Sequence, residues 1–402
     1  MYRHIAVAVD NSADASHAEA GAVALARAAP GAEITGYHVY SGIFHGLRFQ
    51  ALETYLPEEY RTAETLEYQR RIHSVLIGRG LEVISSEYLK RLREACGSGQ
   101  IPFREVLSDG KRSDLLCGAT AEHDLMVMGA QGIGRIDGAG GLGSTTERVL
   151  RDASCDLLVT RAPFSARKIL VGIDGSAESF AALGRAIDLG KVSGAELTLL
   201  AAVNPALHRE VFRLLSGVLS REAGEVFRFR EQEDLHNRII DVSLSDLYRG
   251  HLQRGVLQAA EAGLPCRTVL GEGPAWHALC TGAGKGGHDL VVVGRFGMHR
   301  GPRDRIGSNA VRVAERAPGN VLVVGAAGGA GAGSLPPQAT PAVDASPGAA
   351  LHWDDEAKEK IGRIPSFARP MALLAIERYA REQGIDRITP AVMDAARRRS
   401  GL

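Results

Sequence analysis

The feature that most constrains this chain is an internal repeat. Three landmarks recur at an offset of 164 or 165 residues: HIAVAVDNS at 4 and KILVGIDGS at 168, the aspartates at 124 and 289 that open apolar runs, and the Gly-Ser pairs at 143 and 307. Landmarks that keep one offset over such a distance indicate a duplicated domain. We therefore expect two copies of one fold in tandem.

Within each copy, short apolar runs alternate with helical patterns. The expected strands are residues 4–9, 34–40, 103–107, 125–129 and 156–160 in copy one, and 168–173, 196–203, 266–270, 289–294 and 320–324 in copy two. The expected helices are 14–29, 57–95, 112–122 and 144–152, then 177–191, 207–262, 274–283 and 308–316. This alternation is typical of the α/β class, so each copy is predicted to form a doubly wound, five-stranded parallel sheet.

The remainder of the chain has a different composition. Residues 326–350 consist almost entirely of Gly, Ala, Pro and Ser, which indicates a flexible linker between domains. Residues 351–402 return to helical patterns and are expected to form a small all-α domain. The predicted domains are thus 1–163, 164–325 and 351–402.

Charge and composition exclude several classes of protein. The 47 Lys and Arg residues balance the 47 Asp and Glu residues, which argues against a nucleic-acid binder. The chain has no apolar run of membrane-spanning length and no signal-like start, so we expect a cytoplasmic protein. Five cysteines without a Cys-x-x-Cys pair predict neither a disulfide framework nor a zinc site.

A glycine-rich segment of copy two has the pattern of a phosphate site. Gly294 and Gly297 follow an expected strand, and Gly307-Ser308-Asn309 opens the next helix. Glycines let backbone N–H groups approach an anion, and a helix N-terminus favours phosphate. Asp174 ends the first strand, where its carboxylate can accept hydrogen bonds from a nucleoside, and the backbone of Val203 could address an adenine edge.

These residues resemble a known family. The pattern Gly-x2-Gly-x9-Gly-Ser, preceded by DLVVVG and by an early IDGS, is similar to the universal stress protein family, and the resemblance covers residues 1–325 as two tandem copies. It implies an adenine-nucleotide α-hydrolase-like fold, whose two copies pair about a pseudo-two-fold axis as two separate sheets. It also implies ATP or a related adenine nucleotide, with magnesium as a candidate companion. The implied nucleotide-binding residues are Asp174, Val203, Gly294, Gly297, Gly307, Ser308 and Asn309 in copy two, and Asp10, Val39, Gly129, Gly132, Gly143, Ser144 and Thr145 in copy one.

Copy one departs from the pattern. Ten residues, not nine, separate Gly132 from Gly143, and the extra residue is either absorbed by a bulge or disrupts the phosphate loop. The alternative for both copies is a pair of inherited turns without a ligand. In copy two the loop is basic, and its cations either neutralise phosphate or are simply solvated: Arg295, His299, Arg300, Arg303 and Arg305.

The last fifty residues resemble a second family. The elements Ile-Pro-x-Phe-x-Arg at 364–369 and Glu-x-Tyr-Ala-x3-Gly at 377–384 are similar to the small C-terminal module of the light-independent protochlorophyllide reductase B subunit. The cluster cysteines and the remaining domains of that enzyme are absent from this sequence, so reductase activity does not carry over. The module is interpreted either as a docking or ligand-capping element or as a plain helical bundle.

Three functions follow from these interpretations. The leading hypothesis is a nucleotide-binding sensor or regulator without strong catalysis. The second is a slow ATPase that uses the same loop, although the chain has no Walker A motif and its only candidate for orienting water is Asp304. The third is a nucleotide-free interaction protein whose C-terminal module docks a redox or tetrapyrrole-related complex. Expected partners are a nucleotide, the paired copies themselves, a second chain in a homodimer and a protein bound by the module.

Overall fold

The computed structural model describes residues 1–134, 140–204, 206, 243–298, 304–325, 352–362, 373, 376–377, 379–380, 383 and 385–400. The expected linker at 326–350 and most of the expected helix at 207–262 lie outside these residues. The chain divides into two compact units, and the first of them, residues 1–205 and 244–334, contains both copies of the repeat apart from residues 206–243 of copy two.

The elements of copy one follow the expected alternation. They are β1 (His4–Ala8), α1 (Ala13–Arg27), β2 (Glu33–Tyr40), α2 (Gly42–Leu52), η1 (Glu53–Tyr55), η2 (Glu58–Tyr60), α3 (Ala63–Val75), η3 (Leu76–Gly80), α4 (Leu81–Ser98), β3 (Phe103–Asp109), α5 (Arg112–Ala119), η4 (Thr120–Glu122), β4 (Leu125–Gly129), α6 (Ser144–Asp152) and β5 (Asp156–Thr160).

Copy two repeats the same succession, apart from the residues of its insert that lie outside the described ranges. Its elements are β6 (Lys168–Gly172), α7 (Ala177–Ser193), β7 (Glu196–Val203), α11 (Ser245–Glu261), β8 (Cys266–Glu272), α12 (Ala275–Gly286), β9 (Leu290–Gly294), α13 (Ser308–Arg316) and β10 (Asn320–Val324).

The sheet confirms the predicted fold class and corrects one detail. The five strands of each copy are parallel and follow the same order, β3-β2-β1-β4-β5 and β8-β7-β6-β9-β10. Strands β5 and β10 also pair with each other, antiparallel, so one sheet of ten strands runs through both copies. The expectation of two separate sheets was wrong, because the unpaired backbone groups of each apolar edge strand find their partners in the other copy.

The register of this central pair locates the symmetry axis. Val159 lies opposite Val321, Leu157 opposite Val323, and Leu158 opposite Leu322. Leu158 and Leu322 are equivalent positions of the repeat, 164 residues apart. Because a two-fold axis is the only place where a residue meets its own equivalent, the pseudo-two-fold axis passes between these two leucines.

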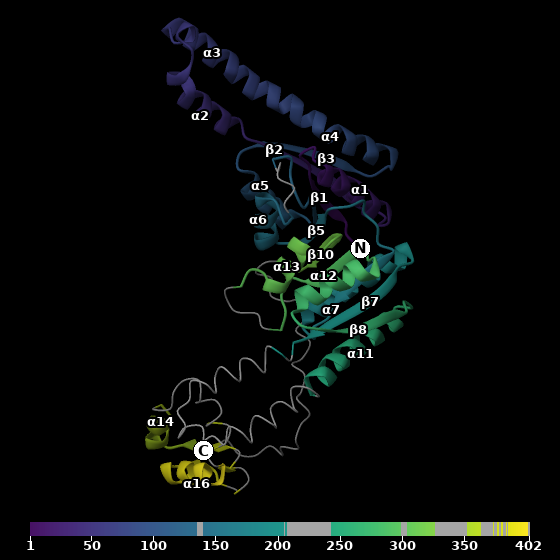
Figure 1. Ribbon diagram of the computed structural model, residues 1–402, viewed down its shortest axis with the longest axis vertical. Helices are drawn as coiled ribbons and strands as arrows, with labels where there is room; N and C mark the ends of the chain where they lie inside the picture. The colour runs from purple at the N-terminus through teal and green to yellow at the C-terminus, as the bar shows by residue number, and fades with distance from the viewer. Residues whose placement is uncertain are drawn as a thin grey trace. The chain divides into compact units, whose positions relative to one another are not determined.

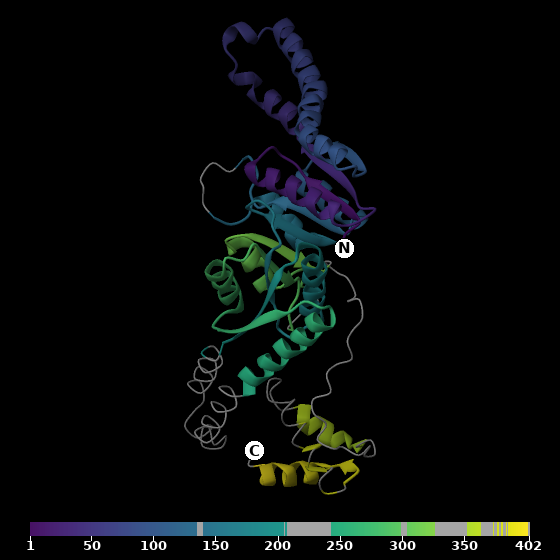
Figure 2. The same cartoon turned by 90° about the vertical axis from the view of Figure 1, so that its right-hand side faces the viewer.

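Alternate residues of the strands build two hydrophobic cores, one on each face of the sheet. Ile5 and Val7 belong to the core beneath α1, α4, α7 and α11, whereas Ala6 belongs to the core beneath α5, α6, α12 and α13. Each core continues from copy one into copy two. Figure 1 shows the helices around the sheet, and in the turned view of Figure 2 the purple helix α1 lies in front of the strands of copy one.

The insert of copy one leaves the sheet. Helices α2 and α3 extend beyond the strands in both views (Figures 1 and 2). The insert packs on the sheet mainly through its end, because Leu89 and Leu92 of α4 are fully buried while Leu47 of α2 and Tyr55 are 58% and 80% exposed. Its beginning is held by a hydrogen bond from the Gly42 N–H to the Asp109 carboxylate at 2.8 Å.

The described part of the C-terminal module has a small core of its own. Helices α14 (Asp355–Gly362) and α16 (Pro390–Ser400) enclose Ala357, Ile388 and Met393. Two short parallel strands, β11 (His352–Trp353) and β12 (Arg387–Ile388), accompany the helices. These strands are an addition to the expected all-α arrangement.

Truncation at the symmetry axis should destabilise the whole first unit. Leu158→Ala and Leu322→Ala each remove a buried side chain from a core shared by the copies, so each should lower the free energy of unfolding by about 2–5 kcal/mol. Leu47→Ala, at an exposed position, should change it by less than about 0.5 kcal/mol. Urea unfolding followed by circular dichroism checks this. Separate transitions, with only one of them shifted, would contradict the single shared sheet.

Candidate functional site

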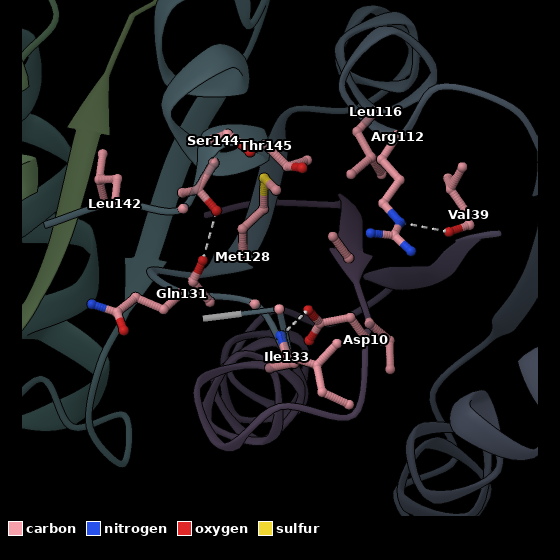
Figure 3. A pocket seen from close by; sticks show the side chains of 18 of the residues that line it. Asp10, Val39, Arg112, Leu116, Met128, Gln131, Ile133, Leu142, Ser144 and Thr145 are labelled. Atoms are coloured by element: carbon pink, nitrogen blue, oxygen red, sulfur yellow. Dashed lines mark hydrogen bonds between the residues drawn. The ribbon is translucent and has the colours of Figure 1, made fainter. Parts of the chain in front are cut away.

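Each copy has a cavity at the carboxyl ends of its central strands. In both copies the strand order reverses there, between β1 and β4 in copy one and between β6 and β9 in copy two, which is where open α/β sheets bind ligands. The cavity of copy one measures about 590 Å³. All seven residues predicted for copy one line it: Asp10, Val39, Gly129, Gly132, Gly143, Ser144 and Thr145 (Figure 3).

The cavity of copy two is larger, at about 770 Å³. Six of its seven predicted residues line it: Asp174, Gly294, Gly297, Gly307, Ser308 and Asn309. Val203 does not, because it is buried and its carbonyl oxygen accepts a hydrogen bond from the Gly273 N–H at 2.8 Å.

The register of the second strand explains the position of Val203. His4 pairs with Glu33 in copy one and Lys168 pairs with Glu196 in copy two, so the offset between copies falls from 164 to 163 residues at this strand. The residue of copy two at the position of Val39 is therefore Ala202, which does line the cavity. A shift of one residue turns a strand's backbone groups to the opposite edge.

The two aspartates hold the glycine loops. Asp10 accepts hydrogen bonds from the Ser12 N–H at 3.1 Å and the Ile133 N–H at 3.0 Å (Figure 3). Asp174 accepts from the Ser176 N–H at 3.0 Å, the Ser176 hydroxyl at 2.6 Å and the Met298 N–H at 3.2 Å. Each carboxylate thus ties the end of the first strand to the loop, and a carboxylate has about four acceptor sites, so each has capacity for a further hydrogen bond.

The glycines of the motif have two different tasks. A Cβ on Gly129 or Gly294 would lie 2.8 Å from helix α1 or α7, so these two glycines allow a helix to pack on the strand end. A Cβ on Gly132 would lie 2.5 Å from Asp10 Oδ2, and one on Gly297 would lie 2.6 Å from Asp174 Oδ2. This second pair lets the loop close against its aspartate.

The helices that follow the loops begin without a side-chain cap. The N-cap of α6 is Gly143 and that of α13 is Gly307, so in neither helix does an N-cap side chain accept a hydrogen bond from the first backbone N–H groups. By contrast, the serines that begin α1 and α7 accept from backbone N–H groups at 3.1 Å. The first residues of α6 and α13, Ser144 and Ser308, line the two cavities, and the unpaired N–H groups and the macrodipole of a helix N-terminus attract anions in general.

The extra residue of copy one leaves the end of its loop unchanged. The Gly143 N–H donates to the Ala130 carbonyl at 2.8 Å, and the Gly307 N–H donates to the equivalent Arg295 carbonyl at 2.8 Å. Residues 135–139 lie outside the described part of the chain. The loop therefore closes on its helix in the same way in both copies.

The basic residues of the second loop lie differently from the expectation. Arg295 is fully buried, and it donates to the carbonyl oxygens of Leu150 at 2.7 Å and Gly325 at 2.5 Å. Its burial lowers the pKa of its guanidinium to about 10. Arg305 pairs with Asp152 of copy one. His299, Arg300 and Arg303 lie outside the described residues.

Several other residues line the cavities, and two of them, with polar side chains that the sequence reasoning did not consider, are Arg112 and Tyr248. Arg112, the first residue of α5, lies in the cavity of copy one (Figure 3), and Tyr248 of α11 lies in that of copy two. Arg112 follows the third strand, whose end meets the same sheet edge, and this placement was the available signal. Tyr248 belongs to an insert whose aromatic residues have no pattern that singles it out.

Two further features are absent from the described residues, a membrane-spanning helix and a metal-binding cluster. No helix there combines the length and apolar character needed to cross a membrane. Likewise, the described ranges hold no cluster of three His, Cys, Asp or Glu side chains able to bind a metal ion.

Comparison with known proteins identifies the family. The model of the universal stress protein family matches residues 1–161 and 165–325, so the chain belongs to this family. Residues 353–397 match a second model, the proto-chlorophyllide reductase 57 kD subunit. Both family predictions are thereby confirmed. Among curated proteins, no match was found.

Solved structures with similar folds are distant in sequence. A universal stress protein from Archaeoglobus fulgidus DSM 4304 is 15% identical, with 81% of this chain and 96% of that chain covered and a TM-score of 0.48. The protein UspA from Lactobacillus plantarum is 24% identical over 40% of this chain and 97% of its own, with a TM-score of 0.28. A universal stress protein in complex with cAMP is 21% identical over 40% and 97%, with a TM-score of 0.24.

Two buried histidines should make stability depend on pH. Burial lowers the pKa of His38, whose Nδ1 lies 2.6 Å from the Val9 carbonyl, and the pKa of His251, which packs against Gly175. As pH falls, the two histidines of the unfolded chain are protonated at a higher pH than those of the folded chain, which favours the unfolded state. The free energy of unfolding should therefore have its full value above about pH 6.5, the ordinary histidine pKa, and decrease below it. We expect a lower urea midpoint at about pH 5.5 than at about pH 7.5.

The double variant His38→Gln plus His251→Gln should reduce this pH dependence. The control is His4→Gln, which replaces an exposed histidine and should leave the dependence unchanged. An undiminished loss of stability in the double variant would mean that other groups are responsible.

Proposed function

We propose that this universal stress protein binds nucleotides in both cavities, with copy two as an adenine-nucleotide site, and acts as a sensor or regulator. The observation that carries the proposal is the pair of helices, α6 and α13, that begin at glycine N-caps without a side-chain hydrogen bond. Uncapped N–H groups beside a tethered glycine loop suit a phosphate chain. Both cavities have volumes typical of small-molecule sites.

The residues of copy two suit the three parts of an adenine nucleotide. The N–H groups of Ser308 and Asn309 would hold phosphate oxygens, and Asp174 would accept from ribose hydroxyls. The backbone of Ala202, not that of Val203, would meet the adenine edge, with Leu200 and Leu279 providing apolar contact. ATP would bring magnesium through its own phosphates. Family membership supports this assignment, and one family member is known in complex with cAMP.

A regulatory role is supported by contacts that join each phosphate helix to the other copy. Arg295, in the glycine loop of copy two, donates to the Leu150 carbonyl of α6. Arg161, at the end of β5, donates to the Ala314 carbonyl of α13, which is the equivalent position. A ligand at the start of either helix would therefore act on an element that the other copy also holds.

An aspartate at Gly307 should abolish ATP binding while preserving the fold. The backbone there is extended, as N-cap residues require, so Gly307→Asp should cap α13. The new Cβ would lie 3.2 Å from the Arg295 carbonyl oxygen, so we expect the capping gain to offset a small displacement there and the fold to be kept. The aspartate carboxylate would occupy the N–H groups and repel phosphate. Calorimetry of the full chain with ATP should show at least a hundredfold loss of affinity at copy two.

The matched control is Gly143→Asp, which makes the same change in copy one and should leave the copy-two affinity intact. The isosteric Gly307→Asn variant caps the helix without the charge and should lose less affinity than Gly307→Asp. Unchanged ATP affinity in Gly307→Asp would refute the site. Turnover of magnesium ATP by the parent chain would favour the slow ATPase instead of the sensor.

A further inference from the structure

We propose that the copy-one cavity selects a 6-oxopurine nucleotide, such as a guanine nucleotide, because Arg112 presents hydrogen-bond donors where copy two presents a backbone acceptor. The inference rests on the proposed function, since it takes the phosphate end of this cavity to be a nucleotide site. It concerns the opposite end, where the base would lie.

The backbone of Val39 forms the polar edge at that end. The Tyr37 carbonyl accepts from the Val9 N–H at 2.9 Å, so this side of β2 faces β1. The Tyr40 carbonyl accepts from the Gly110 N–H at 3.0 Å and so faces β3. Backbone groups alternate along a strand, so the N–H and C=O of Val39, two residues after Tyr37, also point to the side of β1. Strand β1 ends at Ala8, so it does not extend far enough to pair with Val39.

Arg112 has taken the acceptor of this edge. Its Nε donates to the Val39 carbonyl at 3.1 Å, and the dashed line between Arg112 and Val39 in Figure 3 marks this hydrogen bond. The cavity is also lined by Tyr37, Leu116 and Met128, and Leu116 lies beside Arg112 in Figure 3. The neighbouring Lys111 instead pairs with Asp114, so Arg112 is the cation that lines the cavity.

Copy two lacks this cation. In copy one the Gly110 N–H, just after β3, donates to the Tyr40 carbonyl, and in copy two the Gly273 N–H, just after β8, donates to the Val203 carbonyl. Gly110 and Gly273 are therefore equivalent, and the residues that follow them can be matched one by one. Arg112 is two residues after Gly110, and Ala275 is two residues after Gly273, so Ala275 is the copy-two equivalent of Arg112. Ala275 lines the copy-two cavity. A methyl group there leaves the Ala202 carbonyl to face the base directly.

The two edges suit different purines. Adenine carries a 6-amino donor beside an acceptor, which complements the carbonyl and N–H of one residue, as at Ala202. At Val39 the carbonyl is already bonded, and the remaining guanidinium N–H groups are donors only. They complement the O6 and N7 acceptors of guanine, which an arginine can bind together. The amino group of adenine is itself a hydrogen-bond donor, so it could not accept a bond from the guanidinium.

The test compares ADP with GDP in full-length chains that retain one site each. With Gly307→Asp silencing copy two, GDP should bind copy one at least tenfold more tightly than ADP. Adding Arg112→Ala should remove that preference. In the reciprocal chain, with Gly143→Asp silencing copy one, Ala275→Arg should move copy two from ADP towards GDP by at least tenfold.

The outcomes separate this inference from the proposed function. A copy-one site that prefers ADP, with Arg112→Ala unchanged, overturns the base selection while nucleotide binding stands. Binding of neither ADP nor GDP by the parent chain overturns the proposed function and this inference together. Since Arg112 is exposed at its helix start, circular dichroism of Arg112→Ala should match the parent chain, and a loss of fold would be detected before binding is compared.

Discussion

The antiparallel pairing of β5 with β10 is the constraint on which the rest of the first unit depends. Each strand is buried along its whole length, and together they convert two five-stranded sheets into one. Since both faces of the joined sheet are covered, the cores of the two copies merge above and below it. Neither copy keeps a free edge on this side, so neither copy has the complete core that an independent domain would need.

The same junction forces charged groups into the interior. Arg295 crosses it fully buried, and desolvation of its guanidinium is offset by two carbonyl oxygens and by the nearby charge of Asp156. One terminal nitrogen, Nη2, has no hydrogen-bond partner within the described ranges. Arg295 nevertheless lines the copy-two cavity together with Arg151 of α6 and Arg312 of α13, so this cavity wall carries arginines from both copies.

The sequence predicted the fold nearly completely, because the repeat, the apolar runs and the glycine positions are local signals. Asp10 and Asp174 and the two glycine loops could be placed for the same reason. The joined sheet could not be predicted, since the residues of an edge strand do not indicate which partner covers them. Val203 was expected at the adenine edge because it ends the second strand, but its carbonyl faces the third strand and Ala202 is the residue that matches Val39. Copy one is one residue longer than copy two between the first two strands, so the correspondence could be read only from the register.

The two cavities have diverged unevenly, and the divergence follows the structure of the junction. At the end proposed for phosphate, both copies close the loop with the same hydrogen bond and start a helix at a glycine N-cap, and the other copy contacts the far end of that helix. A change there would disturb both copies at once. The end proposed for the base lies beside β2 and α5 in copy one and beside β7 and α12 in copy two, away from the axis. Arg112 stands there in copy one where copy two has Ala275, and neither residue is part of the junction between the copies. Under the proposed function, a fused pair of this kind can vary the ligand of each copy while the helices at the junction stay fixed.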